Sequence, residues 1–380
     1  MIYFDNSAST LIKPKSVVRA VCDSLNYYSA NPGRSGHKQA IKAAMAVESV
    51  RDLCARYVGT TADQIIFTLN CTDALNLAIL GGFRPAGHVI CTENEHNSVL
   101  RPLEHLKNID DTFSYSVVNQ STLKGIVWSD IEKELKTNTY MVICNHISNV
   151  NGDIADIIDI GKHLNDLGIM FLVDGAQGGG HFRYDMQKMN INFLSLAPHK
   201  GFYSPQGVGV LAINNAPLLS PIRFGGTGTN SLELFQPASS PERFESGTLN
   251  TPAILGFGEG IKFLEENFSK IQEKLEDLTT YLHYELSKLP VEIHTQIENT
   301  SGVFSFNIPN ANCIDVANFL DEKFDICVRS GFHCAPLKHK ALNTVEKGGS
   351  IRVSLSYFNT YQEVEKFVYA IKYYLKHNCR

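Results

Sequence analysis

Residues 169–179 read Ile-Met-Phe-Leu-Val-Asp-Gly-Ala-Gln-Gly-Gly, an apolar run followed by an acid and a glycine-rich turn. The run 169–173 predicts a strand buried on both faces, which is typical of a sheet covered by helices. Asp174 comes at the carboxyl end of that strand, where α/β sheets hold their ligands. The stretch therefore predicts an α/β fold with a ligand site beside Asp174, although an Asp here can also serve only as a turn former.

Similar apolar runs recur on both sides of this stretch. They lie at 65–67, 89–91, 140–144, 193–196 and 208–211, and helical segments at 97–107, 129–136 and 156–167 separate several of them. Strands that alternate with helices predict a mainly parallel sheet with helices on its faces.

The pattern changes after about residue 255. A long amphipathic stretch over 257–289 is followed by a strand (303–308), a helix (314–323), strands near 326–329 and 350–356, and a last helix (361–376). Because these elements form no long alternating series, they predict a second, smaller α+β domain.

The composition excludes several classes of protein. The 380 residues are 43% hydrophobic, and 34 basic against 39 acidic residues give a net charge of -5. A nucleic-acid-binding protein would show a basic surplus, and a membrane protein a run of roughly 18 apolar residues. The first residues also lack the pattern of a signal peptide. We therefore expect a cytoplasmic enzyme with neither nucleic acid nor membrane as its partner.

Lys200 follows the apolar run 193–196 in the string Ser195-Leu-Ala-Pro-His-Lys-Gly201. A lysine in a partly desolvated pocket loses its proton more readily, which suits a Schiff-base lysine, whereas an ordinary loop lysine is the plainer interpretation. If the ligand is pyridoxal phosphate, Asp174 pairs with the pyridinium nitrogen and keeps it protonated. Lys200 and Asp174 each stand at the end of their own strand, which favours the functional interpretation.

A possible phosphate site precedes this region. Asn70-Cys71-Thr72-Asp73-Ala74 follows a strand and opens a helix. Free backbone N–H groups at a helix start and the Thr72 hydroxyl can bind an anion. The same residues also fit an ordinary helix cap.

Nine cysteines, an odd number scattered along the chain, do not suggest a disulfide framework. We expect Cys54, Cys91, Cys144 and Cys327 to be core residues, because they lie in apolar strands or on an apolar helix face. Cys334 differs, because it stands in the loop Arg329-Ser-Gly-Phe-His-Cys-Ala-Pro-Leu337.

A reactive thiol needs a positive environment. The sequence offers His333, Lys338, His339 and Lys340 for this purpose. A zinc site formed by His333, Cys334 and His339 is an alternative, although the spacing fits no standard pair of ligand pairs.

Together these motifs resemble fold-type I pyridoxal phosphate enzymes of the class V aminotransferase group, and within it the cysteine desulfurase and selenocysteine lyase branch. The resemblance runs from Tyr3 to Thr360 and rests on the co-occurrence of His199-Lys200, Asp174–Gln177, Arg243–Thr248 and Arg329–Cys334. It implies a large pyridoxal phosphate-binding domain over 15–255 and a small C-terminal domain over 256–380 that includes the N-terminal segment 1–14. It also implies a homodimer with shared active sites.

The resemblance assigns roles around the cofactor ring. Lys200 would hold the cofactor covalently and shuttle protons, Asp174 would face the ring nitrogen, and Gln177 would face the phenolic oxygen. His96 matches the ring-stacking histidine and a possible acid or base, and Asn149 matches the asparagine near cofactor and substrate.

The resemblance also assigns a phosphate site. Thr72 and His199 would bind the phosphate, Cys71 would line its turn, and Thr248 would reach the phosphate of the other subunit. Ala197 departs from the pattern, because many desulfurases carry a phosphate-binding serine there.

The implied reaction removes sulfur from L-cysteine. Arg352 would bind the substrate carboxylate in a bidentate fork, which a lysine could not reproduce. Cys334 would attack the substrate sulfur, giving alanine and a persulfide for an acceptor protein or small thiol. A selenocysteine lyase, and another class V enzyme such as an aminotransferase, epimerase or C–S β-lyase, stay open as alternatives.

Overall fold

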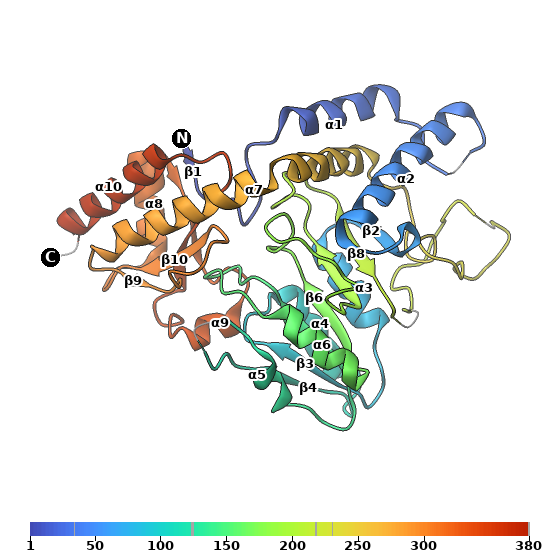
Figure 1. The fold of residues 1–380 in the computed structure, drawn as a ribbon, viewed down its shortest axis with the longest axis horizontal. Coiled ribbons are helices and arrows are strands. Elements are labelled where there is room, and N and C mark those ends of the chain that lie inside the picture. Colours follow the sequence, from blue (N-terminus) through green and yellow to red (C-terminus); the bar gives the residue numbers. More distant parts are fainter. Residues whose placement is uncertain (34, 123–124, 217–218, 230, 379–380) are drawn as a thin grey trace.

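A seven-stranded sheet forms the centre of the larger part of the molecule in a computed structural model, which describes all residues except 34, 123–124, 217–218, 230 and 379–380 (Figure 1). Its strand order is β2-β8-β7-β6-β5-β3-β4. The strands are β2 (Ile65–Thr68), β3 (His88–Thr92), β4 (Ser114–Val118), β5 (Thr139–Asn145), β6 (Met170–Asp174), β7 (Phe193–Leu196) and β8 (Gly209–Ile213). All neighbouring pairs are parallel except those of β8, which runs antiparallel to β2 and β7.

The predicted mainly parallel sheet is thus confirmed. Every residue of β5, β6, β7 and β8 is buried, as their continuous apolar runs require. We did not predict β4, which lies at the sheet edge and is mostly half-buried, because an edge strand needs no long apolar run. The register places Asn145, Asp174 and Ser195 side by side at the carboxyl ends of three neighbouring strands.

Helices cover both faces of this sheet. They are α2 (Lys38–Val58), α3 (Cys71–Gly81), α4 (Asn97–Ile109), α5 (Trp128–Glu132) and α6 (Ile157–Leu167), with a 3-10 turn η1 (Ala62–Gln64) before β2. Alternate strand residues divide between two hydrophobic clusters: Val142 and Val173 lie in the cluster that contains α2 and α6, and Met141 and Leu172 in the cluster that contains α3 and α4. The helix predicted over 129–136 is shorter than expected, since α5 ends at Glu132.

The C-terminal part contains a second sheet, in the order β12-β13-β10-β9 and fully antiparallel. Its elements are β9 (Glu292–Ile293), β10 (Val303–Asn307), α8 (Cys313–Phe324), β11 (Ile326–Cys327), β12 (Arg329–Gly331), α9 (Pro336–Ala341), β13 (Ser350–Ser354) and α10 (Tyr361–Asn378). The N-terminal strand β1 (Ile2–Tyr3) pairs in parallel with β11 and so lies beside the C-terminal part (Figure 1).

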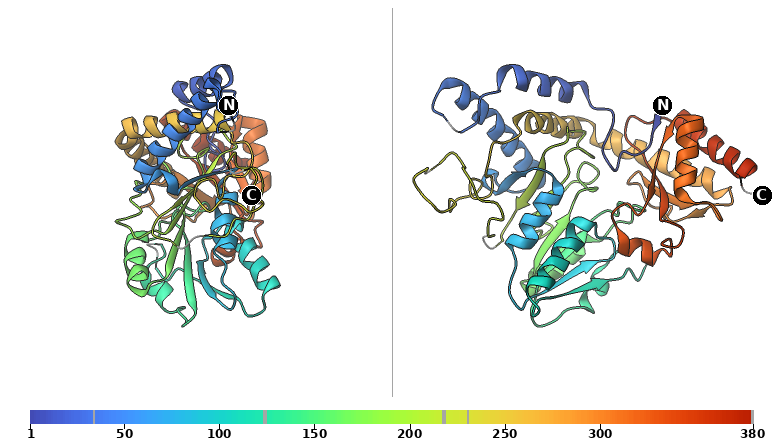
Figure 2. Two further views of the ribbon diagram at one scale, coloured as in Figure 1. Left: turned by 90° about the vertical axis from the view of Figure 1, so that its right-hand side faces the viewer. Right: turned by 180° about the vertical axis from the view of Figure 1, so that it is seen from behind.

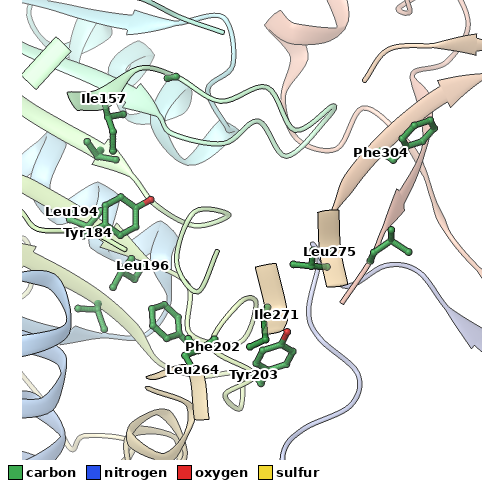
Figure 3. Packing of buried hydrophobic residues seen from close by; sticks show 14 of the residues in the cluster. Ile157, Tyr184, Leu194, Leu196, Phe202, Tyr203, Leu264, Ile271, Leu275 and Phe304 are labelled. Carbon is green, nitrogen blue, oxygen red and sulfur yellow. The ribbon is translucent and has the colours of Figure 1, made fainter. Parts of the chain in front are cut away.

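One long helix, α7 (Thr251–Ser287), connects the two parts. It packs against α1 (Lys15–Tyr27) and α2 at one end and against α10 at the other (Figure 1 and Figure 2). Figure 3 shows its side chains Leu264, Ile271 and Leu275 within one cluster that reaches from the large sheet to Phe304 of β10. The boundary predicted near residue 255 therefore falls inside α7, and the division into two domains stays a prediction.

Two further sequence-based expectations concern membranes and cysteines. Among the described residues, no helix combines the length and the apolar character that crossing a membrane requires. Cys54, Cys91 and Cys144 are buried, as predicted. The prediction for Cys327 was wrong: this residue is half-buried, because β11 has two residues and pairs only with β1.

Candidate active site

A cavity of about 230 Å³ lies at the carboxyl ends of the central strands. It brings together nearly all the site residues that the sequence predicts: Cys71, Thr72, His96, Asn149, Asp174, Gln177, His199, Lys200 and Arg352 line it. Ala197, Arg329 and His333 also line it. Cys334 and Thr248 stand outside this lining and are described below.

Asp174 and Lys200 bring an acid and an amine into the lining of the cavity. Asp174 is buried, and its Oδ1 accepts hydrogen bonds from the Ala176 N–H at 2.9 Å and the Ser195 hydroxyl at 3.5 Å. Burial raises the pKa of Asp174, whereas these hydrogen bonds and the nearby Lys200 charge favour its ionised form. Burial lowers the pKa of the Lys200 amine, because its charge loses hydration. The amine is thereby shifted toward the neutral form that a nucleophile requires.

The start of α3 also lines the cavity, and its Cys71 sulfur lies 3.9 Å from Asp174 Oδ1. Asn70 caps this helix, its side chain accepting from the Asp73 N–H at 3.0 Å. The Thr72 hydroxyl lies 3.1 Å from the Ser98 hydroxyl. The Nδ1 atom of His199 is buried and has no hydrogen-bond partner among the described residues. A helix start with hydroxyl groups and a free ring nitrogen fits an anionic group such as phosphate.

His96 is both a site residue and the cap of α4. Its Nδ1 accepts the Ser98 N–H at 3.0 Å, so the neutral ring carries its proton on Nε2. Burial, together with the nearby charges of Lys200 and Arg329, lowers the pKa of His96 to about 4. The ring is therefore neutral near pH 7, and a neutral aromatic ring can stack on an aromatic cofactor.

Arg352 lies on β13 and is held by two partners from distant parts of the chain. Its Nη2 forms a 2.7 Å ion pair with Asp5, and its Nη1 donates to the Asn149 carbonyl at 2.9 Å. The Nε atom of Arg352 and the Oδ1 atom of Asn149 are buried without partners within the described residues. Asp5 is a site residue that sequence reasoning missed, because an acid in the N-terminal segment shows no local pattern that points to Arg352.

Cys334 lines a neighbouring cavity and not the first one. A cavity of about 400 Å³ is lined by Cys334 and shares Thr72, His96 and Ser98 with the first. Arg329, which lines the first cavity, brings its Nη2 to 3.8 Å from the Cys334 sulfur. The Cys334 side chain is half-buried.

Most of the residues that we predicted to supply positive charge to Cys334 do not do so, and for them the prediction was wrong. Lys338 is buried and paired with two carboxylates. Burial lowers the pKa of His339 to about 4 and that of His333 well below its usual value, so both rings are neutral near pH 7. Arg329 is the cation in contact with the thiol. The sequence could not indicate this, because Arg329 reaches Cys334 only across the turn after β12.

The zinc alternative gains no support from the side chains. His339 Nδ1 bonds the Thr344 hydroxyl at 2.7 Å and His333 Nε2 bonds the Ser350 hydroxyl at 3.2 Å, while the other ring nitrogen of each has no hydrogen-bond partner among the described residues. In the part of the chain that the structure describes, no three His, Cys, Asp or Glu side chains are grouped so that they could hold a metal ion.

Thr248 lies outside its own chain's cavity. It is exposed and accepts a 3.3 Å hydrogen bond from the Asn31 side chain. The Gln177 side chain, in contrast, lines the cavity and donates to the Ser7 carbonyl at 3.0 Å.

The cavity suits a cofactor that combines an aromatic ring, a basic ring nitrogen and a phosphate. The residues present a lysine, a buried acid, a neutral histidine and a helix start, and the unpartnered atoms of His199 and Asn149 lie on the same cavity. Ala197 lines it with a methyl group, so one hydroxyl donor implied by the resemblance is absent. The remaining donor set fits pyridoxal phosphate.

The chain belongs to the class V aminotransferase family, whose sequence model, Aminotransferase class-V, matches residues 2–367. This is a family of pyridoxal phosphate-dependent enzymes with the fold-type I architecture, so the predicted fold class and cofactor are confirmed.

Individual relatives are more specific. The chain is 34% identical over 375 residues to a probable cysteine desulfurase of Methanothermobacter thermautotrophicus. The alignment covers 96% of this chain and 92% of that relative. The chain is also 34% identical over 379 residues to a probable cysteine desulfurase of Pyrococcus abyssi, covering 97% and 92%. The apo structure of a cysteine desulfurase from Thermococcus onnurineus NA1 superimposes with a TM-score of 0.92 at 32% identity, over 99% of this chain and 94% of that one.

Proposed function

We propose that this protein is a cysteine desulfurase, which converts L-cysteine to L-alanine and leaves a persulfide on Cys334 for transfer to an acceptor. The observation that carries the proposal is the position of Cys334. Its sulfur contacts Arg329, which lines the cavity that holds Lys200 and Asp174. A class V site with a thiol at its edge, beside a cation, can transfer sulfur as well as bind an amino acid.

Pyridoxal phosphate, when bound, supplies an electron sink that weakens bonds at the α-carbon of an amino acid. Lys200 would hold it covalently and later move a proton at the substrate α-carbon. Asp174 would pair with the ring nitrogen, Gln177 would face the phenolic oxygen, and His96 would stack on the ring. Burial raises the pKa of Asp174, and the adjacent Lys200 charge acts in the opposite direction. A protonated ring nitrogen beside Asp174 would likewise favour the ionised form of this buried acid.

The substrate would be oriented by two residues with unpartnered atoms. Arg352 would bind its carboxylate, since the Asp5 ion pair already fixes the guanidinium and the Nε donor is free. Asn149 would approach both substrate and cofactor through its unpartnered Oδ1. Thr72, Cys71 and His199 would hold the phosphate.

Cys334 would then attack the substrate sulfur as a thiolate. A sulfur–sulfur bond forms as the Cβ–S bond breaks, and the electron pair of the broken bond stays with carbon, which takes up a proton. The products are alanine and the Cys334 persulfide, so no external oxidant or reductant is needed. The Arg329 guanidinium, whose Nη2 lies 3.8 Å from the Cys334 sulfur, would place a positive charge beside the reacting sulfur.

We also propose that the enzyme is a homodimer in which the partner subunit's Thr248 completes the phosphate site. Two observations support this. Thr248 is exposed and lies outside its own cavity. The preceding segment also carries exposed apolar side chains, Phe224, Leu232, Leu234 and Phe235, which a second copy would cover.

The sulfur acceptor would be a protein or a small thiol that reaches the half-buried Cys334. We propose that the enzyme works in the cytoplasm, because the cysteines of the described residues are free and its persulfide chemistry needs a reduced thiol.

The test is L-cysteine turnover by the purified pyridoxal phosphate form, with Cys334→Ser as the variant and Cys22→Ser, at an exposed cysteine, as its matched control. Cys334→Ser should keep the cofactor absorbance and lose both alanine production and the persulfide detected by mass spectrometry. Cys22→Ser should retain both. Full alanine production by Cys334→Ser would contradict the proposed role, and pyruvate in place of alanine would indicate β-elimination.

A further inference from the structure

A buried cluster of charged side chains includes Lys338 of α9, the helix that follows the turn at His333 and Cys334 (the Cys334 turn). Lys338 Nζ is 2.9 Å from Asp153 Oδ2 and 3.4 Å from Glu93 Oε1, and it also donates to Gln120 at 3.3 Å. The side chains of Lys338 and Glu93 are 3% and 7% exposed, and that of Asp153 is 4% exposed. Charges this far from water persist only when they are paired, so the cluster holds its three segments together.

Each of the three segments lies next to a residue of the proposed site. Lys338 lies in α9, directly after the Cys334 turn. Glu93 follows β3 and immediately precedes the segment of His96. Asp153 follows the turn 149–151, which contains Asn149. The cluster therefore ties the thiol-bearing turn to two segments that line the cofactor cavity.

The turn itself has an unfavourable backbone. His333 and Cys334 have φ values of 48° and 59°, in the left-handed region that non-glycine residues rarely occupy. Such a conformation persists when the surroundings hold it in place. Two backbone contacts contribute: the Cys334 carbonyl accepts the Asn97 N–H at 2.8 Å, and the His333 carbonyl accepts from the Asn149 side chain at 2.6 Å.

We propose that Lys338 is a positioning residue for the desulfurase reaction, whose ion pairs with Asp153 and Glu93 hold the Cys334 turn against the cofactor cavity. The inference rests on the proposed function, in which Cys334 is the nucleophile. Lys338 would act by holding Cys334 in position. Its positive charge is already paired with two carboxylates, so it would not act electrostatically on the thiol. A nucleophile displaced by about 1 Å can lose roughly 100-fold in rate.

The experiment uses Lys338→Met in the pyridoxal phosphate-loaded full chain. Amide hydrogen exchange over residues 331–342 should become faster, and alkylation of the Cys334 peptide by iodoacetamide, followed by mass spectrometry, should accelerate with it. The rate of alanine formation should fall by roughly 10- to 100-fold, with a much smaller change in KM for cysteine. The cofactor absorbance should stay unchanged.

Two further variants separate positioning from general damage. Lys347→Met removes the same charge from an exposed pair with Glu292 and should leave exchange, alkylation and turnover unchanged. Lys338→Arg keeps a cation between the two carboxylates and should restore most of the protection. If Lys338→Met fails to fold, the triple variant Lys338→Met, Asp153→Asn and Glu93→Gln, which leaves no unpaired buried charge, takes its place with the same expected results.

Unchanged exchange and alkylation around Cys334 in a folded variant would overturn the inference, as would an equal loss in Lys347→Met. The proposed function fails separately, through absence of alanine from the wild-type enzyme. Exchange and alkylation need no turnover, so they judge the anchoring role even in that case.

Discussion

Arg352 presents its guanidinium from a site that is almost closed to solvent, at 1% exposure. The Asp5 ion pair and the Asn149 carbonyl use two of its nitrogens and fix the plane of the group. A rigid guanidinium loses little conformational freedom when a carboxylate binds, which favours recognition by geometry as well as by charge.

We expect Arg352→Lys to raise KM for cysteine by roughly 10- to 150-fold, because a hydrogen bond to a charged group contributes about 1.5–3 kcal/mol and a lysine lacks the fork. Initial rates over a range of cysteine concentrations measure this, with the cofactor absorbance as a check of the site. Asp5→Asn, which keeps a hydrogen-bond acceptor beside Arg352, should raise KM less. An unchanged KM in Arg352→Lys would rule out its role in carboxylate binding.

Chemistry at the residue scale was largely predictable where it depends on position along a strand. Asp174 and Lys200 follow apolar runs, and parallel strands bring their carboxyl ends together, so their meeting in one cavity could be expected. Arg329 could not be recognised as the contact of Cys334, because the turn after β12 decides which side chain reaches the sulfur.

At the scale of elements, a buried ion pair joins α2, β2 and the segment that leads to Thr248. Arg51 of α2 forms a bidentate pair with Glu245, at 2.7 and 2.9 Å, and donates to the Ile65 carbonyl at 2.5 Å. Glu245 also accepts the Phe67 N–H at 2.7 Å, which occupies a backbone donor of an edge strand. Both partners are nearly inaccessible to solvent.

Arg51→Met should therefore lower the free energy of unfolding by about 3–5 kcal/mol, because it leaves Glu245 buried without its cation. Urea unfolding measures the loss. Lys262→Met, which breaks a largely exposed pair with Glu259, is the matched control and should change stability by less than about 1 kcal/mol. Equal effects of the two substitutions would show that burial does not govern the strength of this pair.

The elements themselves were predicted unevenly, for a physical reason. Strands buried on both faces leave continuous apolar runs in the sequence, and β5, β6 and β7 were located within a residue or two. The edge strand β4 leaves no such run, and the connection 133–138 between α5 and β5 cannot be distinguished by periodicity from a continued helix.

At the scale of the whole molecule, buried neutral histidines make stability depend on pH. Burial lowers the pKa of His88 to about 4, of His146 to about 3 and of His339 to about 4. The unfolded chain, with histidine pKa values near 6.5, binds more protons. Stability should therefore fall as the pH falls from about 6.5 toward 4. Glu95 has the opposite effect on stability, because burial raises its pKa to about 8 and the folded chain then binds more protons. This single group offsets the effect of only one of the three histidines.

We expect His88→Gln to flatten this dependence by up to about 1.4 kcal/mol per pH unit, the slope that one bound proton contributes. His88 bonds the Thr139 and Ser116 hydroxyls, and a glutamine side chain offers similar donors and acceptors without titrating. Urea unfolding at pH 6.5, 5.5 and 4.5 measures the slope. His105→Gln, at an exposed histidine, should leave the slope unchanged; a steeper or identical slope in His88→Gln would contradict the assignment.

The sequence by itself determined the α/β class and the strand-end positions of Asp174 and Lys200, because buried strands and the residues that follow them form short local patterns. The cofactor chemistry and most of the other cavity residues followed from the resemblance of the sequence motifs to a known family. Only the tertiary structure decided which distant groups meet: Asp5 pairs with Arg352, and Lys338 pairs with Glu93 and Asp153. It also placed Thr248 outside the cavity of its own chain. These contacts join residues that share no periodicity. They form only when the chain folds and brings the segment after β1 to Arg352 of β13, and α9 to Asp153 and Glu93 of the larger part.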